Sequence, residues 1–594
     1  MTPTQLRSAL GQAQALATAG DVAGARRVLV PCTRAPAVPA AIWAALGRLD
    51  LAAGDPTSAR KNLERAAALA PNAPGVLEAL GVACWHTGDL DSASRLLGTV
   101  IRRWPDRVLA HVTLADVRLR QRRLRDVDHL ATTLARIAPA RPHHHRLRAL
   151  AAVERGQLEL ADRCLRTWLQ HHPEAVEARG LLADLLSRAR RFDEAEALFQ
   201  SALDTSPTNL VLRTRYAHHR GRQGHFDEAH TIFADVARHS PHQGAHLANR
   251  GIAEMWTGQL DAAVASLQAA VELEPHNASH RWNLSHALLQ SGDLATGFEV
   301  YEQRIALFGP PDWWEQRWRG ESLPPGSPLV LDAMQGLGDA IQFVRFAADA
   351  EKRGAQVIVR AHPRLMPLFA GARGVARVVS SKEPPPTPAR RSRLLSLPHV
   401  LGIHAPEQLG HHVPYIQVPS DRRATWAERL AGPGVRVGIV WQGNPSYEQD
   451  HLRSPPLAHF LPLTRIPGVQ LFSLQKFHGV DQLDAVDLDA HPITHLGPQL
   501  DRDVAFLDTA AAMHALDLVL TSDTSIAHLA GALGVPTWVV LPYAPDWRWP
   551  RTSHTSAWYP TMRLFRQTRP GDWAGVFDRV AEALTAHPER VPSR

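Results

Sequence analysis

Cysteine is scarce in this chain of 594 residues, and long apolar runs are absent. The three cysteines, Cys32, Cys84 and Cys164, are scattered and odd in number, which excludes a disulfide framework and suits a reducing compartment. No apolar stretch approaches the about 18–20 residues that cross a bilayer, and the start, MTPTQLRSALGQAQ, carries no signal-peptide pattern. We therefore expect a cytoplasmic protein without a transmembrane segment.

Strong charge of one sign is also missing. The formal net charge of +7 is modest for this length, so we expect no nucleic-acid partner. A groove for phosphates or acidic partners would explain the basic excess equally well. The length exceeds what one hydrophobic core can organise, so two or more domains are expected.

Prolines recur in the first half at a constant interval. Each step is 34 residues, the period of the tetratricopeptide repeat, and the prolines are Pro71, Pro105, Pro139, Pro173, Pro207, Pro241 and Pro275. Twelve residues before each proline stands a compact residue, where two helices must cross closely: Ala59, Ala93, Val127, Ala161, Ala195, Ala229 and Ala263. The same phase runs back to Gly20 and forward to Tyr301, which predicts about nine helix pairs with degenerate ends.

Turn and crossing residues follow the same period. Small residues recur on the first helix of the pairs: Gly47, Gly81, Ala115, Ala149, Ala183, Ala217 and Gly251. Glycines separate the two helices: Gly54, Gly88, Gly156, Gly224, Gly258 and Gly292. Stacked pairs of this kind form a superhelix whose groove binds an extended peptide or a partner helix.

Two features of the repeats are candidates for binding. Asn249 and Asn283 share one phase in adjacent repeats, where an amide could bond an acceptor peptide, although simple helix-surface polarity explains them as well. The histidine run at 143–145 is a formal metal tract, but it stands at the start of a repeat without Cys or carboxylate partners in sequence.

The second half has the alternation of an α/β protein. The runs PLVLDAM, AQVIVRA, RLLSL, VRVGIVW, VQLFSL, LDLVLT and TWVVLP are predicted as buried strands. Helical stretches such as AIQFVRFAADAEKRG and TSIAHLAGALG separate them, which predicts parallel sheets in two Rossmann-like lobes. The predicted divisions are a repeat array over 1–308, a Pro/Trp-rich connector over 309–327, a first lobe over 328–430 and a second lobe over 431–594.

A carboxylate follows the first predicted strand. The loop Gln335–Asp339 leads into a helix, but Ile341 replaces the third glycine of a dinucleotide loop. Asp339 therefore lies in a ligand crevice as a candidate catalytic group, or serves only as a helix cap. Gly338 belongs to the same loop, and Gln342 and Arg345 follow at helical spacing toward the same cleft.

The segment after LDLVLT is the strongest local motif. Asp523, Thr524 and Ser525 precede a helix, where free N–H groups and hydroxyls form an anion site that fits a diphosphate. His528 lies one turn further, within reach of the phosphates or a sugar, or as a structural histidine. Gly531 keeps this helix thin against the sheet.

Other strand ends add polar and aromatic candidates. Asn444 and Arg453 follow VRVGIVW, and Gln475 and Lys476 follow VQLFSL. The two cations would neutralise phosphate charge, or are solvated surface charges. Trp547 and Trp549 follow the last strong strand and either stack on bases or sugars or pack the lobes together.

Two formal D-x-D patterns raise the alternative of a metal-dependent transferase. They are Asp487–Asp489 and Asp501–Asp503, and neither ends a predicted strand. We therefore predict no metal site and no cofactor other than a nucleotide-sugar co-substrate.

These motifs in order resemble a family. Residues from about 328 to 580 are similar to bacterial glycosyltransferases of the GT-B fold related to the lipopolysaccharide heptosyltransferases. The matching segments are Gly336–Asp339, Trp441–Asn444, Ser473–Lys476, Asp523–Thr524, His528–Ala532, Pro545–Trp549, Trp558–Pro560 and Arg563–Phe565. The layout of repeats followed by this domain resembles tetratricopeptide-repeat protein glycosyltransferases, including enzymes that modify flagellin.

The resemblance implies roles for individual residues. Asp339 matches the acidic residue assigned as catalytic base, and the segment from Asp523 to His528 matches the donor-diphosphate loop. Relatives often carry Glu where this chain has Met334, so the role of that carboxylate is missing here.

The resulting hypothesis is inverting, metal-independent transfer of a sugar from a nucleotide donor to a protein hydroxyl. Flagellin is the favoured acceptor, held by the repeats. A lipopolysaccharide glycosyltransferase and a non-catalytic tetratricopeptide scaffold are the alternatives.

Overall fold

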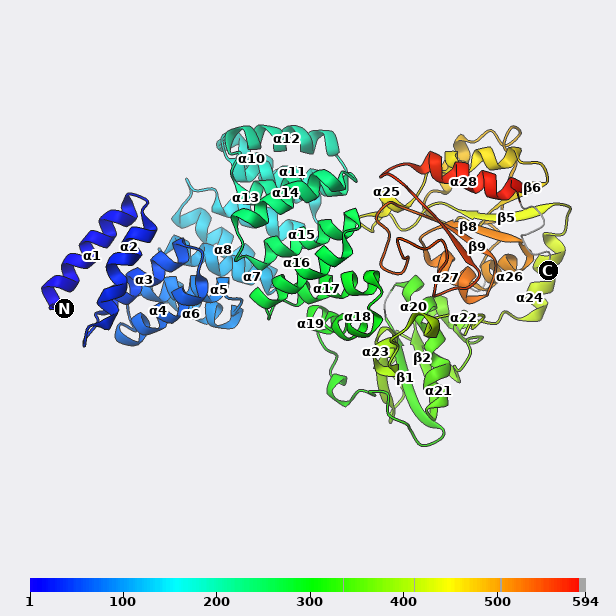
Figure 1. The fold of residues 1–594 in the computed structure, drawn as a ribbon, viewed down its shortest axis with the longest axis horizontal. Helices are drawn as coiled ribbons and strands as arrows, with labels where there is room; N and C mark the ends of the chain where they lie inside the picture. The colour runs from blue at the N-terminus through cyan, green and yellow to red at the C-terminus, as the bar shows by residue number, and fades with distance from the viewer. Residues whose placement is uncertain (335, 411, 503–504, 587–594) are drawn as a thin grey trace. The chain divides into compact units, whose positions relative to one another are not determined.

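The computed structural model describes residues 1–334, 336–410, 412–502 and 505–586, and it comprises two compact units, Met1–His219 and Arg220–Arg594. The predicted fold class is confirmed, because an all-helical tetratricopeptide region precedes an α/β region with parallel sheets (Figure 1). Within the described residues, no helix is both long enough and apolar enough to span a membrane.

The repeats form nine consecutive helix pairs and one short final helix. The pairs are α1 (Pro3–Thr18) with α2 (Val22–Leu29), α3 (Ala40–Ala52) with α4 (Pro56–Leu69), α5 (Pro74–His86) with α6 (Leu90–Arg103), α7 (Val108–Arg120) with α8 (Leu124–Ile137), α9 (His143–Glu154) with α10 (Leu158–His171), α11 (Val176–Arg188) with α12 (Phe192–Thr205), α13 (Leu210–Arg222) with α14 (Phe226–His239), α15 (Gly244–Thr257) with α16 (Leu260–Leu273), and α17 (Ala278–Ser291) with α18 (Leu294–Tyr301). The final helix is α19 (Arg304–Phe308).

The small residues lie where helices cross, as the period predicts. A Cβ atom at Gly81 would stand 2.7 Å from Leu97 Cγ, and one at Gly251 would stand 2.6 Å from Leu267 Cγ. The seven compact residues before the prolines are all fully buried. Close helix contact therefore requires a minimal side chain at these positions.

The turns between paired helices share a left-handed backbone. The predicted glycines adopt positive φ, for example 80° at Gly88, but the same phase falls on Arg122 and Arg190, which adopt φ of 56° and 60°. This conformation costs a residue with a Cβ roughly 1–2 kcal/mol. The repeat geometry thus overrides local preference in two of its turns.

Two parallel sheets make up the α/β part. The first has the order β3 (Arg377–Ser380), β2 (Ala355–Ala361), β1 (Ser327–Ala333), β4 (Arg390–Arg393). The second has the order β10 (Met562–Arg566), β9 (Thr537–Leu541), β8 (Leu518–Ser522), β5 (Val435–Val440), β6 (Val469–Ser473), β7 (Ile493–His495). The longer α/β helices are α20 (Leu337–Phe343), α21 (Ala347–Lys352), α24 (Ser420–Arg429), α26 (Leu507–Ala515), α27 (Ser525–Ala532) and α28 (Trp573–Ala586).

One predicted strand is wrong. The segment RLLSL begins with the last residue of β4 and continues as a 3₁₀ turn over Leu394–Ser396. The strand itself is Arg390–Arg393, whose arginines hid it from a search for apolar runs. The short strands β3, β7 and β10 were missed because they hold few consecutive apolar residues.

The core of the α/β part includes the end of the repeats. Phe298 and Tyr301 of α18 pack against Trp547, with ring centroids 6.1 Å apart in both cases. Leu289 and Leu294 belong to the same buried cluster. In the connector, Trp318 is fully buried, and Arg391 lies 4.2 Å above the ring of Trp313.

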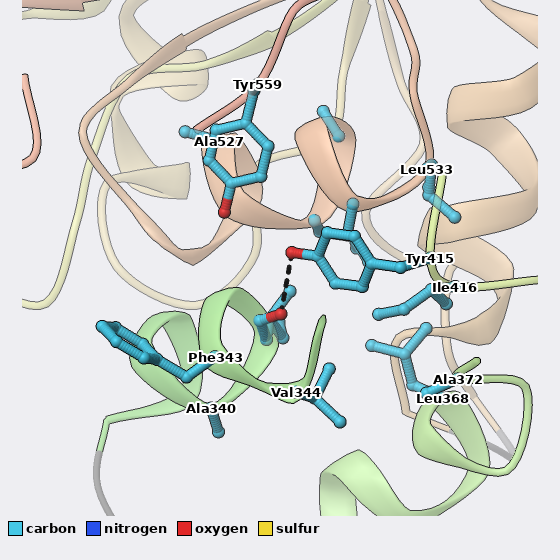
Figure 2. Close-up of a cluster of buried hydrophobic side chains, with 14 of the residues drawn as sticks. Ala340, Phe343, Val344, Leu368, Ala372, Tyr415, Ile416, Ala527, Leu533 and Tyr559 are labelled. Atoms are coloured by element: carbon cyan, nitrogen blue, oxygen red, sulfur yellow. Dashed lines mark hydrogen bonds between the residues drawn. The ribbon is translucent and has the colours of Figure 1, made fainter. Parts of the chain in front are cut away.

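The helices α20 and α27 lie side by side between the two sheets (Figure 1). Figure 2 shows Phe343 and Val344 on one side and Ala527 and Leu533 on the other, with the ring of Tyr415 between them. The Tyr415 hydroxyl donates a hydrogen bond of 2.9 Å to the Ile341 carbonyl. This core holds the loops that follow β1 and β8 close to each other.

We expect Arg122→Gly to stabilise its repeat, because glycine accepts a left-handed backbone without the steric cost. The gain should be about 1 kcal/mol, seen as slower amide hydrogen exchange in α7 and α8. Gly88→Ala is the reciprocal control and should accelerate exchange in α5 and α6. Unchanged or faster exchange in Arg122→Gly would contradict this expectation. It would show that the 3.6 Å ion pair between Arg122 and Glu154 stabilises the repeat by at least as much as the left-handed backbone destabilises it.

Candidate functional site

The order of the strands places a crevice in each sheet. In the first sheet the strand order reverses at β1, which has β2 on one side and β4 on the other. In the second sheet it reverses between β5 and β8. In open α/β sheets ligands bind beyond the carboxyl ends of the strands at such switch points.

A cavity of about 1270 Å³ opens at these strand ends. Its walls come from the loops after β1, β5, β6, β8 and β9 and from the last repeats, where Trp256, Trp282 and Tyr301 contribute. The structure brings most of the predicted site residues to this cavity. They are Gly338, Asp339, Asn444, Arg453, Gln475, Lys476, Asp523, Thr524, Ser525, His528 and Trp547.

Asp339 faces the cavity from the first turn of α20, with 34 % of its side chain exposed. Its Oδ1 accepts a hydrogen bond of 2.7 Å from the Arg548 guanidinium, which is only 9 % exposed. Arg548 also donates to Asp546 Oδ1 at 2.9 Å and to Gln342 Oε1 at 2.6 Å. The Arg548 guanidinium thus joins Asp339, which follows β1 of the first sheet, to Asp546, which follows β9 of the second sheet.

Burial and neighbouring charge set the ionisation of this cluster. Burial raises the pKa of Asp339, and the attraction of Arg548 opposes the shift only in part. Burial also favours neutral Asp546, but Arg548 outweighs it and the pKa of Asp546 falls below its ordinary value. Asp339 is therefore a better proton acceptor than a surface aspartate.

His528 lies on α27, against the first turn of α20, which carries Asp339. Its Nδ1 lies 2.9 Å from the Tyr559 hydroxyl, and its ring stacks on Trp549 with centroids 5.7 Å apart. Burial lowers the pKa of His528 to about 3, so the imidazole is neutral at physiological pH. Gly338 permits this close packing, because a Cβ there would lie 3.0 Å from His528 Cδ2.

The start of α27, for which the sequence predicts an anion site, lies at the cavity wall. Thr524 is the N-cap residue, and its hydroxyl accepts from Ile526 N at 3.3 Å. Asp523 is buried beside it, and burial, then the charge of Asp546, raises its pKa to about 6. The Thr524 hydroxyl and the positive end of the α27 dipole thus meet at the cavity wall.

The loop after β5 is organised by a buried carboxylate that the sequence analysis missed. Asp450 accepts from Gln442 Nε2 at 3.0 Å, Arg453 Nε at 3.1 Å and the Ser454 hydroxyl at 3.2 Å. A Cβ at Gly443 would stand 2.4 Å from Asp450 Oδ1, so glycine is required there. This network holds Arg453 at the cavity.

Gln475 and Lys476 differ in what they can offer a ligand. Gln475 Oε1 accepts from the backbone N–H groups of Trp441 and Gln442 at 3.0 and 3.1 Å, and its Nε2 donates to the carbonyls of Gln442 and His478. Its amide is therefore fully used in joining two loops. Lys476 Nζ donates to the Leu500 carbonyl at 2.7 Å and lies 3.7 Å from Asp501, at the cavity wall.

Several predicted site residues lie elsewhere or serve the core. Trp549 is fully buried, and Gly531 packs beneath Tyr559, where a Cβ would approach a ring carbon to 2.3 Å. Gln342 is buried behind Asp339 and bonds Arg548. Asn249 and Asn283 are half-buried on α15 and α17 and do not line the cavity.

Two further expectations from the sequence concern Arg345 and the tryptophans after β9. Arg345 does not face the cleft, since it is buried and donates to the carbonyls of Leu409 and Trp558. Trp547 reaches the cavity wall, yet it is 5 % exposed and its ring packs on α18. The polar residues that alternate with the tryptophans are Asp546 and Arg548, and Arg548 bonds both Asp339 and Asp546. Their alternation with aromatics after a strand was the available signal.

The D-x-D candidates have local structural partners. Asp487 Oδ1 accepts from the backbone of Asp489 and Ala490, and Asp501 caps α26 by accepting from Thr509. Asp503 and Gln335 lie outside the described residues. In the described part of the chain, no three His, Cys, Asp or Glu side chains are grouped to hold a metal, and the histidines at 143–145 form no such group.

Comparisons with known proteins support the repeats. One tetratricopeptide-repeat model matches residues 44–93, 146–209 and 249–307, and a second such model matches 188–249. Protein FlbA of Caulobacter vibrioides is 26% identical over 457 residues, which span 72% of this chain and 75% of that protein.

Two solved structures with a local likeness are those of tetratricopeptide-repeat proteins. A thermophilic tetratricopeptide-repeat protein of Thermus thermophilus is 26% identical with a TM-score of 0.28, over 30% of this chain and 96% of that one. A tetratricopeptide-repeat protein of Parabacteroides merdae is 17% identical with a TM-score of 0.33, over 41% of this chain and 96% of that one.

We expect Gln475→Glu to destabilise the loops at the cavity, because a carboxylate oxygen would replace the amide N–H groups that meet two carbonyls. The cost should be about 2–3 kcal/mol, measured as a lower thermal midpoint and faster hydrogen exchange at 441–443. Gln499→Glu, at an exposed position, is the control for added charge. Equal midpoints for the two variants would show that Gln475 does not support these loops.

Proposed function

We propose that this chain is a GT-B glycosyltransferase that moves a sugar from a nucleotide donor to a hydroxyl of a protein acceptor, with flagellin the favoured acceptor. The observation that carries the proposal is one cavity lined by Asp339, by the start of α27 and by Lys476 and Arg453. A proton acceptor and a phosphate-binding wall thus share one space. The resemblance of the sequence motifs to heptosyltransferase-related enzymes points to the same reaction.

The reaction requires a base on one side of the sugar and charge stabilisation on the other. Asp339 accepts the proton of the acceptor hydroxyl while the oxygen of that hydroxyl bonds to the anomeric carbon of the sugar. The bond from that carbon to the phosphate oxygen breaks, and the nucleotide leaves with the electron pair. The configuration at the anomeric carbon inverts, because the acceptor oxygen attacks one face of that carbon and the phosphate leaves from the opposite face.

The second sheet supplies the positive charge for the departing phosphate. Lys476 and Arg453 bring two cations to the cavity, and α27 directs the positive end of its dipole there from Thr524 onward. The carbonyl and carboxylate partners of Lys476 hold its ammonium in place. The donor therefore binds with its phosphates toward the second sheet.

The repeats are proposed to hold the protein acceptor. Tetratricopeptide arrays bind polypeptides, and the last repeats form part of the cavity wall. An acceptor segment that leaves these repeats thus reaches Asp339 directly. Comparing flagellin by intact mass from strains with and without this chain tests the acceptor, and an unchanged flagellin mass would exclude it.

We expect Asp339→Asn to reduce transfer by about 10²–10⁴-fold while donor binding is retained. The amide oxygen can still accept the Arg548 hydrogen bond, but the amide cannot take up a proton. Lys476→Ala, by contrast, should weaken donor binding as well as turnover. A transfer assay with calorimetric titration of the donor measures both, and near-wild-type transfer by Asp339→Asn would reduce this residue to a helix cap.

The pH profile should distinguish Asp339 from His528 as the base. Because the pKa of Asp339 is raised, activity should be lost on acidification at a higher pH than for a surface aspartate. His528, with a pKa of about 3, stays neutral over the range from pH 5 to 8. His528→Asn should therefore keep the acid limb of kcat/KM, whereas a shift of that limb would assign it to the imidazole.

Turnover is expected to survive excess chelator, because side-chain cations and a helix N-terminus oppose the phosphate charge. The assay compares initial rates with and without EDTA in the same buffer. Loss of activity that manganese or magnesium restores would overturn this expectation.

A further inference from the structure

We infer that Tyr301, the last residue of the repeat helix α18, binds the acceptor hydroxyl beside Asp339 and so completes the active centre from the repeats. This inference rests on the proposed function. It assigns the tyrosine hydroxyl to a hydrogen bond with the attacking oxygen, whose own proton points to Asp339.

The ring of Tyr301 is enclosed by aromatic and cationic neighbours. Only 4 % of the residue is exposed. Trp282 lies 4.9 Å away between ring centroids, Trp547 lies 6.1 Å away, and the Arg304 guanidinium stands 5.0 Å from the ring centroid. The ring therefore has a fixed direction that does not depend on its hydroxyl.

The hydroxyl itself has no partner among the residues that the structure describes. Buried tyrosines usually find a hydrogen-bond partner, as Tyr415 and Tyr559 do here. Tyr301 nevertheless lines the cavity, so the part of it that remains accessible opens toward bound ligands. An unused donor and acceptor at a cavity wall is a group for a ligand.

Tyr301 and Asp339 line the same cavity, and the charged groups around Asp339 also act on the tyrosine. Burial raises the pKa of Tyr301 to about 12, and the charges of Arg548, Arg304 and Asp339 act on the same phenol. The hydroxyl thus stays protonated at physiological pH and can donate. Its neighbours come from the repeats, from α20 and from the segment after β9. The proposed phosphate-binding groups follow β5, β6 and β8, which favours the acceptor over the donor.

The test compares full-length Tyr301→Phe with wild type in transfer to recombinant flagellin from the strain that encodes this chain. The phenyl ring preserves the packing, and no hydrogen bond within the described residues is lost, so the thermal midpoint should not change. We expect kcat/KM for flagellin to fall about 10- to 100-fold, with the donor Kd unchanged. Tyr216→Phe, whose hydroxyl bonds Glu196 and does not line the cavity, is the control for loss of a tyrosine hydroxyl and should retain wild-type kinetics.

The outcomes separate this inference from the proposed function. Equal kcat/KM for Tyr301→Phe and wild type would overturn the role of the hydroxyl while leaving the transferase intact. A weaker donor Kd with an unchanged acceptor KM would place the hydroxyl on the donor and also overturn the inference. Absence of any transfer by wild type would remove the proposed acceptor and the inference with it.

Discussion

The α/β part depends on the hydrogen bonds that the buried guanidinium of Arg548 donates. Removing a guanidinium from water costs several kcal/mol unless its donors are matched. Here Asp339, Asp546 and Gln342 match them, and these three partners come from α20 and from the segment after β9. The same contacts that join the two sheets therefore fix the direction of the proposed base. Loss of Arg548 would leave two like charges facing each other in a buried space.

The repeats could be predicted almost completely, because their constraint is periodic. A residue such as Gly81 is required at each helix crossing, and the constraint returns every 34 residues. The two exceptions, Arg122 and Arg190, adopt the backbone that glycine adopts elsewhere. Periodic packing forces the turn even where local preference opposes it, so the period predicted the structure better than any single residue did.

The α/β site could be predicted only in part. Polar residues at the ends of apolar strands, such as Asp339 and Thr524, were found because parallel strands bring their carboxyl ends together. Arg548 and Asp450 were missed because their importance comes from partners far away in the chain or in an irregular loop. The strand Arg390–Arg393 was missed for a related reason: its arginines flank a buried serine and carry no apolar signal.

The shared core of α18 and the α/β part limits how this gene can be rearranged. Sequence periodicity suggests a domain boundary after residue 308. The last repeat helices nevertheless contact the α/β part across this boundary: Phe298 packs on Trp547, and Arg304 of α19 donates to Ser396. A recombination at that boundary would expose apolar surface on both halves of the chain. Exchange of repeats before α13 leaves these contacts intact. The early repeats can therefore diversify by duplication or replacement, whereas α14 to α19 must be inherited together with the sheets.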